Sequence, residues 1–194
     1  MKAKILIVLI LPAILASCDD KISRCNLTEA QKQLIPYEKE QVISFIDSAG
    51  LTVDLTVTES QVWWTSKERF GGAFYDSYIT NEAKSVILES ESNNLEVRLT
   101  ICNSGYSECS NYSSLSISID TNSINSSWFR LNFDTEGNFS TDSYSSIHDS
   151  LEINGKVYYN VVEINKGSEQ LFYNKTYGIL QVRKDGENFL TLKD

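Results

Sequence analysis

The sequence predicts a mainly β protein in which an antiparallel meander forms a curved sheet, a sandwich or a barrel-like domain, with one short N-terminal helix. Three observations support this fold class. Apolar and polar residues alternate with a period of two over most of the chain after residue 40. Asn-Gly, Asp-Gly and other turn sequences separate the alternating segments at short intervals. The sequence leaves no room for the crossover helices that a parallel sheet requires.

The short helix is predicted to begin near residues 26–31. Asn26 and Thr28 are both suitable N-caps, because Glu29 and Gln31 follow them three residues later. Pro36 sets the limit of this helix, since the residue before a proline avoids helical backbone angles. We therefore expect one or two turns.

The strands are predicted from the alternation, in chain order. Leu51, Val53, Leu55 and Val57 share one face of a strand that pairs with residues 42–46 across the turn at 47–50. Asn154-Gly155 is a strong two-residue hairpin signal. Residues 138–150 are rich in Ser, Asp and Asn, and we expect them to form a loop. The remaining strands are expected at residues 61–70, 73–80, 84–90, 95–102, 112–120, 128–134, 151–153, 157–164, 170–173, 179–183 and 188–192.

The first residues have the pattern of a secretory signal. Lys2 and Lys4 precede an apolar run over residues 5–15, which is too short to cross about 30 Å of hydrocarbon as a helix. Leu15-Ala16-Ser17-Cys18 follows and resembles the lipobox of bacterial lipoproteins. The resemblance implies cleavage before Cys18, diacylglycerol on its thiol and an acyl chain such as palmitate on its amine. Two or more chains hold a protein firmly on a membrane.

This organisation predicts a signal peptide at 1–17, a lipidated tether at 18–25 and a single β-rich domain at 26–194. Asp19 and Asp20 resemble the surface-export signal of lipoproteins in the Bacteroidetes, whereas Asp at this place in enterobacteria resembles an inner-membrane retention signal. Residues 35–57, which begin Ile35-Pro36-Tyr37, and residues 154–192 are similar to small uncharacterised lipoproteins of flavobacteria. That resemblance implies an outer-membrane location, leaves surface exposure open, and implies no catalytic residues.

The mature chain is strongly acidic. The whole chain has a formal charge of −9, and residues 1–17 contain two basic and no acidic residues, so their removal leaves −11. The remaining Lys and Arg residues are scattered, and such a chain is repelled by nucleic acid. The expected partners are the membrane, through the lipid anchor, and an unknown protein, glycan or lipid ligand, with no nucleic acid.

Cysteine spacing predicts a disulfide and no metal site. An exported protein folds in an oxidising compartment, and Cys102 and Cys109 flank the turn sequence Asn103-Ser104-Gly105, so we predict a bridge between them. Cys25 is then left over; it is either free or replaces one member of the pair. CxxC spacing is absent, so no zinc site and no other cofactor is expected.

No arrangement of residues in the sequence predicts catalysis, so no catalytic residue is assigned. His148-Asp149-Ser150 has the residue types of a Ser-His-acid site, but adjacent strand residues point to opposite faces and no Gly-x-Ser-x-Gly elbow occurs. Asp134-Thr135-Glu136-Gly137-Asn138 superficially resembles a calcium loop, but the pattern is incomplete and predicts a hairpin turn. We expect a protein that is not an enzyme.

Two groups of residues are candidates for ligand binding. The first is aromatic and either stacks on sugar rings or, as we expect, contributes to the core and to hairpin cross-strand pairs: Trp63, Trp64, Phe70, Phe74, Tyr75 and Tyr78. The second is apolar and either fills a closed core or lines a groove for an apolar ligand: Leu99, Ile101, Leu115, Ile117, Ile119, Phe129, Leu131 and Phe133. The expected function is a non-enzymatic binding or interaction module on the envelope. The alternative is a carrier of lipid or another apolar ligand in a half-barrel groove.

Overall fold

The computed structural model describes residues 21–65, 68–70, 77–103, 112–121 and 126–193. Most of these residues are in β-strands, and the helical structure among them is confined to α2 (Glu29–Lys32) and the 3-10 turn η1 (Glu91–Asn93). The strands are β1 (Lys21–Cys25), β2 (Val42–Asp47), β3 (Thr52–Trp64), β4 (Glu68–Phe70), β5 (Ser77–Ser90), β6 (Leu95–Asn103), β7 (Tyr112–Thr121), β8 (Ser127–Asp134), β9 (Phe139–Ser140), β10 (Ser145–Ile153), β11 (Lys156–Lys166), β12 (Glu169–Asn174), β13 (Gly178–Lys184) and β14 (Glu187–Leu192).

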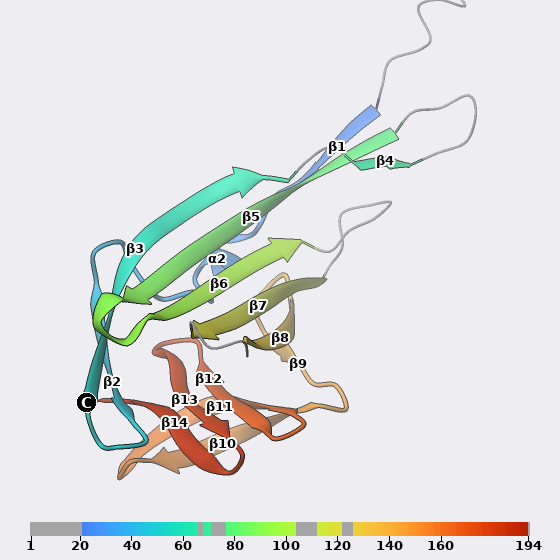
Figure 1. Cartoon of the computed structure of the whole chain (residues 1–194). Helices are drawn as coiled ribbons and strands as arrows, with labels where there is room; N and C mark the ends of the chain where they lie inside the picture. The colour runs from blue at the N-terminus through green and yellow to red at the C-terminus, as the bar shows by residue number, and fades with distance from the viewer. Residues whose placement is uncertain (1–20, 66–67, 71–76, 104–111, 122–125, 194) are drawn as a thin grey trace, which may run out of the picture.

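These strands belong to one sheet that curls into a half-barrel (Figure 1). Its strand order is β10-β11-β12-β13-β14-β2-β3-β5-β6-β7-β8-β9, with β1 and β4 added on β5. Chain neighbours are mostly sheet neighbours, except that β14 pairs antiparallel with β2 and joins the end of the chain to its beginning. The predicted mainly antiparallel β fold is thus confirmed.

The local predictions with the strongest signals are confirmed. Ile43 pairs with Leu55 in the first hairpin, and Val53, Leu55 and Val57 are all buried on one face. The prediction is wrong for Leu51, which precedes β3 in the turn and is 65 % exposed. Asn154 and Gly155 form the β10–β11 turn with φ of 54° and 79°. Helix α2 has Thr28 as N-cap and a complete capping box with Gln31.

Three predicted boundaries are wrong. The tether predicted at 18–25 includes β1, a strand that pairs in parallel with β5, so the sheet is not purely antiparallel. The loop predicted at 138–150 contains β9 and most of β10, which is largely exposed because it lies at the end of the sheet. The strands predicted at 73–80 and 84–90 are parts of one strand, β5, although residues 71–76 lie outside the described residues.

The concave face of the sheet encloses the main core. The core takes side chains from β2, β3, β5, β6, β7, β8, β11, β12, β13 and β14. Contacts between β8 and the β11–β12 region close the curl: Lys166 Nζ donates to the Trp128 carbonyl at 3.0 Å, and Ser127 Oγ donates to Glu169 Oε1 at 2.5 Å. The two ends of the sheet therefore face each other across a filled interior.

Residues 26–37, which we call the N-terminal plug, cover one end of this interior. Its apolar side chains Leu27, Leu34 and Ile35 are 1–3 % exposed and belong to the core. Gln31 Nε2 donates to Ser113 Oγ at 3.1 Å and to the Asp134 carbonyl at 3.2 Å, which attaches α2 to β7 and β8. The plug is thus an integral part of the fold.

Lys84 of β5 holds the end of the plug helix. Its Nζ donates to the carbonyl oxygen of Lys32 at 2.9 Å and to that of Ile35 at 3.1 Å. Carbonyl groups at the C-terminal end of a helix have no partner within the helix, and Lys84 satisfies them here. Burial lowers the pKa of Lys84.

Glu82 of β5 binds the plug on the same side. Its carboxylate lies 3.0 Å from Lys32 Nζ and accepts from the Leu27 amide at 2.8 Å. The bond with Glu82 raises the pKa of Lys32.

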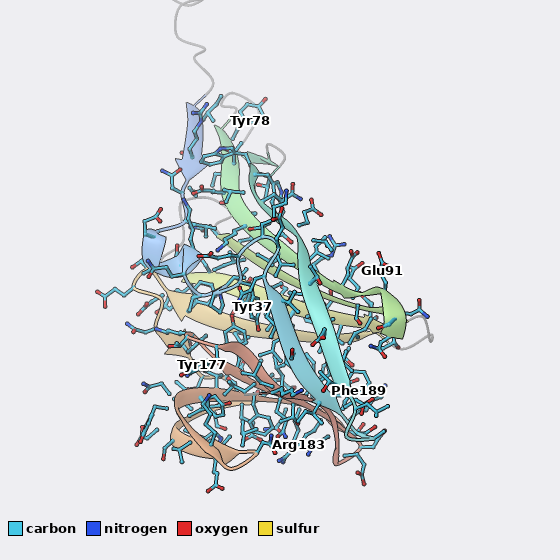
Figure 2. All side chains as sticks on the ribbon, turned by 90° about the vertical axis from the view of Figure 1, so that its left-hand side faces the viewer. Tyr37, Tyr78, Glu91, Tyr177, Arg183 and Phe189 are labelled. Carbon is cyan, nitrogen blue, oxygen red and sulfur yellow. The ribbon has the colours of Figure 1, made fainter. Side chains whose placement is uncertain are left out.

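A second feature, which we call the arm, extends from the body of the half-barrel (Figure 1). It consists of β1, β4, the first five residues of β5 and the last residues of β3. Strand β6 pairs with β5 only from Ala83 onward, so the residues 77–81 that pair with β1 project about 17 Å beyond that point. Figure 2 labels Tyr78 on this arm.

Candidate functional site

A cavity of about 390 Å³ lies at the rim of the half-barrel, between the plug, β2, β11 and the β12–β13 turn. We call it the rim pocket. Tyr37 and Tyr177 are labelled beside it in Figure 2. It is lined by Pro36, Tyr37, Gln41, Val42, Ile43, Ser44, Lys156, Thr176, Tyr177, Leu192 and Lys193. The lining residues include two lysines and no acidic residue, so the pocket is locally positive in an acidic protein.

The aromatic wall of the rim pocket is built around Lys156. Its Nζ lies 5.2 Å from the ring centroid of Tyr177 and 5.3 Å from that of Tyr158, and the two rings meet edge to face at 5.3 Å. Tyr177 is 43 % exposed, whereas Tyr158 is buried. A half-exposed ring beside a cation offers a stacking surface and a positive charge to one ligand.

The floor of the pocket is rigid because Tyr37 is completely packed. The Ile179 amide donates to Tyr37 Oη at 2.7 Å, and Gly178 has φ +76°, with a geometry in which an added Cβ would overlap the Tyr37 ring. Tyr173 Oη donates to the Leu34 carbonyl oxygen beside it. Burial raises the pKa of both phenols well above their ordinary value of 10.0.

Sequence reasoning did not single out the rim pocket as a site. Its residues come from five segments that lie far apart in the chain, and none of them carries a recognisable ligand motif. Gly178 is the one signal that was available: it follows Tyr177 directly and has to be a glycine because Tyr37 fills the space of a side chain.

The eight apolar candidates lie together, but they do not form an open groove. Leu99, Ile101, Leu115, Ile117, Ile119, Phe129, Leu131 and Phe133 are 0–3 % exposed in the main core. The plug and the β11–β13 side chains occupy the space that a ligand would need. The curl of a half-barrel is present, and of the two alternatives for these eight residues the structure has the closed core.

None of the aromatic candidates whose side chains are described is buried. Trp64 is 45 % exposed, and Trp63 and Tyr78 are partly exposed, so the expected core role is wrong for Trp64, which has Glu82 of β5 as its cross-strand neighbour. Only the backbone of Phe70 is described, and Phe74 and Tyr75 lie outside the described residues.

The cysteines differ from the prediction. Cys102 is not in a disulfide: its Sγ donates to the Asn103 carbonyl oxygen at 3.3 Å, so the bridge predicted to Cys109 is not formed in the structure. Cys25 is 1 % exposed and disulfide-bonded. Its partner is not Cys102, the other cysteine among the described residues. Cys109, Cys18 and the export residues Asp19 and Asp20 lie outside the described residues.

The two polar groups that suggested chemistry have structural roles. His148 Nε2 lies 2.7 Å from Glu163 Oε2 and 3.4 Å from Ser146 Oγ, so the acid and the hydroxyl share one ring nitrogen, whereas a Ser-His-acid relay needs them on opposite nitrogens. Asp134 Oδ1 accepts from the amides of Glu136 and Asn138 at 2.9 and 2.8 Å, which confirms the hairpin turn. These bonds, above all that from Asn138, lower the pKa of Asp134.

Comparison with known proteins found no relative: no family model, no curated protein and no solved structure matches the chain. Among the described residues no group of three or more His, Cys, Asp or Glu side chains is placed to hold a metal ion. In the same part of the chain, no helix has the length and apolar character needed to cross a membrane.

Proposed function

We propose that this protein is a lipid-anchored envelope protein that acts as a non-enzymatic binding module, with the rim pocket as its ligand site. The observation that carries the proposal is the position of Cys18, the lipobox cysteine, directly before the fold. Asp19 and Asp20 alone separate it from β1. An extended chain advances about 3.5 Å per residue, so Lys21 lies within about 10 Å of an anchor on Cys18. Lipidation there would hold the arm at an outer membrane, with the body beyond it.

The rim pocket supports the binding role through its chemistry. Lys156 and Lys193 supply positive charge, and Tyr177 supplies a half-exposed ring. This combination suits a sugar that carries a carboxylate, sulfate or phosphate, because the ring stacks on the sugar and the lysine pairs with the anion. The proposed ligand is therefore an acidic glycan.

The anchor is tested by metabolic labelling with palmitate in a bacterial host. Cys18→Ser should abolish the label and move the protein from the membrane to the soluble fraction. Cys102→Ser is the matched control and should keep the label. Labelling of Cys18→Ser at the wild-type level would overturn the anchor.

The pocket is tested separately with the unlipidated domain, so that failure of one part leaves the other intact. Titration calorimetry should show binding of a trigalacturonic acid and weaker binding of its neutral galactose analogue. Tyr177→Ala and Lys156→Met should each weaken binding about tenfold. Tyr159→Ala is the control, because Tyr159 lies on β11 with Lys156, is 66 % exposed and does not line the pocket. Equal affinity in all variants, or no binding, would overturn the rim pocket as a site for acidic sugars.

A further inference from the structure

The concave face of the half-barrel continues along the arm beyond the plug. Residues of β5 with even numbers lie on this face: Val86 and Leu88 belong to the main core, and Lys84 contacts the plug. Tyr78 and Thr80 continue the same face on the arm, and paired residues of β1 and β3 share it. The exposed or partly exposed side chains on this part of the face are Ile22, Arg24, Val62, Trp64, Tyr78 and Thr80. Glu82, the cross-strand partner of Trp64, lies on the same face but is buried and bonded to the plug.

This part of the face is apolar and exposed. Ile22 is 50 % exposed, Val62 52 % and Trp64 45 %. Ile22, Arg24, Trp64 and Thr80 line a cavity of about 290 Å³, and Arg24 Cζ lies 6.0 Å from the Trp64 ring centroid. An apolar face with a half-exposed tryptophan and an arginine is typical of side chains that lie at a lipid–water interface.

We propose that this face of the arm, around Ile22, Trp64 and Arg24, rests on the lipid headgroup region of the membrane that carries the protein. The inference depends on the proposed anchor at Cys18, which places β1 within about 10 Å of the lipid surface. At that distance Ile22 and Trp64 reach the interface. The Arg24 guanidinium, whose Cζ lies 6.0 Å from the Trp64 ring centroid, adds a positive charge beside the ring on the same face. The acidic body is held away from anionic headgroups.

Two tryptophans with the same exposure allow a matched experiment. Trp64 lies on the arm and Trp128 on the body, and each is 45 % exposed. One protein keeps Trp64 alone, through Trp63→Phe and Trp128→Phe, and the other keeps Trp128 alone, through Trp63→Phe and Trp64→Phe. Both are purified in the lipidated form and reconstituted in phosphatidylethanolamine–phosphatidylglycerol vesicles with and without brominated acyl chains.

The expected result is strong quenching of Trp64 by brominated lipid and little quenching of Trp128. In addition, Ile22→Ser combined with Trp64→Ser should lower vesicle binding of the unlipidated domain at least tenfold. Absence of palmitate label would show that the anchor itself is wrong. A labelled protein whose Trp64 is not quenched, or whose two tryptophans are quenched equally, would overturn the arm contact and leave the anchor intact. Concentration-dependent shielding of Trp64 without vesicles would overturn it in favour of a second copy of the chain.

Discussion

Gly178 and Tyr37 show how one residue sets the shape of the rim pocket. Gly178 has a positive φ and lies against the Tyr37 ring, so an added methyl group has to displace a buried aromatic side chain. Gly178→Ala should lower the free energy of unfolding by about 3 kcal/mol, from overpacking together with backbone strain. Urea denaturation checks this value.

Gly186→Ala is the matched control. Gly186 has φ +83° but meets no atom within 4 Å, so only the backbone contribution of about 1 kcal/mol is expected. Equal losses for the two variants would show that Tyr37 does not fill the space beside Gly178.

The buried phenols Tyr37 and Tyr173 predict alkaline sensitivity. Below pH 10 both are protonated in the folded and unfolded states. Above it the unfolded chain loses these protons at the ordinary pKa of 10.0, while burial raises both pKa values in the fold. The stability that the two phenols contribute is therefore fully present below about pH 10. Above that pH the free energy of unfolding falls by up to about 1.4 kcal/mol per tyrosine and pH unit.

Tyr37→Phe should remove about half of the contribution that the two tyrosines make to the fall of the free energy of unfolding with pH. The variant also loses the bond from the Ile179 amide, which lowers stability at every pH without changing the slope. The pKa of Lys84 is lowered and that of Lys32 is raised in both proteins, so the difference between the two curves reports on Tyr37 together with its charge effect on Tyr173. Parallel stability curves from pH 9 to 11 would contradict the prediction.

At the scale of elements, the plug helix is held by its buried side and not by its exposed ion pair. Gln31 is 1 % exposed, completes the capping box and bonds β7 and the β8–β9 turn, so Gln31→Ala should cost about 2–3 kcal/mol. Thermal denaturation checks the loss.

Glu29→Ala in the same helix provides the comparison. Glu29 pairs with Lys32 at 3.4 Å but its side chain is 83 % exposed, so the cost should stay below about 0.5 kcal/mol. A larger loss for Glu29 than for Gln31 would show that the plug is not docked through its buried face.

Cys25 of β1 is disulfide-bonded, and Cys102 is not in a disulfide. Because Cys18 is the proposed lipid site, we predict that Cys109 is the partner of Cys25. Peptide mapping without reductant should recover these two cysteines linked. Cys25→Ser should lower stability by about 2–4 kcal/mol, and Cys102→Ser by much less. A peptide linking Cys102 to Cys109 would contradict this pairing.

Across the whole molecule, the curl is closed by contacts between strands far apart in the sheet. Ser127 Oγ donates to Glu169 Oε1 at 2.5 Å, over 42 residues of chain. A double-mutant cycle with Ser127→Ala and Glu169→Gln should give a coupling energy of about 1–2 kcal/mol. The pair Ser44–Asp54 has the same distance but is exposed within one hairpin, so its coupling should be below about 0.5 kcal/mol. Equal couplings would show that the curl is not held at this point.

The elements were predictable wherever their stabilisation is local. The capping box of Thr28 and Gln31, the Asn154-Gly155 turn and the alternation of Val53, Leu55 and Val57 depend on residues a few positions apart, and each was confirmed. Strand β10 was missed because it is an exposed strand at the end of the sheet, and its polar pattern resembles a loop. Strand β1 was missed because its partner, β5, lies more than 50 residues away.

Periodicity and capping motifs are properties of neighbouring residues, so the mainly β fold class and the short capped helix could be predicted from the sequence, whereas the secretory and lipobox resemblance stays a prediction. The contacts of the folded chain were needed to show that the half-barrel interior is filled, that the plug completes it and that Lys156 and Tyr177 lie beside Tyr37. These facts depend on contacts such as Tyr37 with Ile179, 142 residues apart, and Tyr173 with Leu34, 139 apart. A buried leucine has the same alternation whether a ligand or another side chain covers it, so the pattern alone cannot separate a groove from a core.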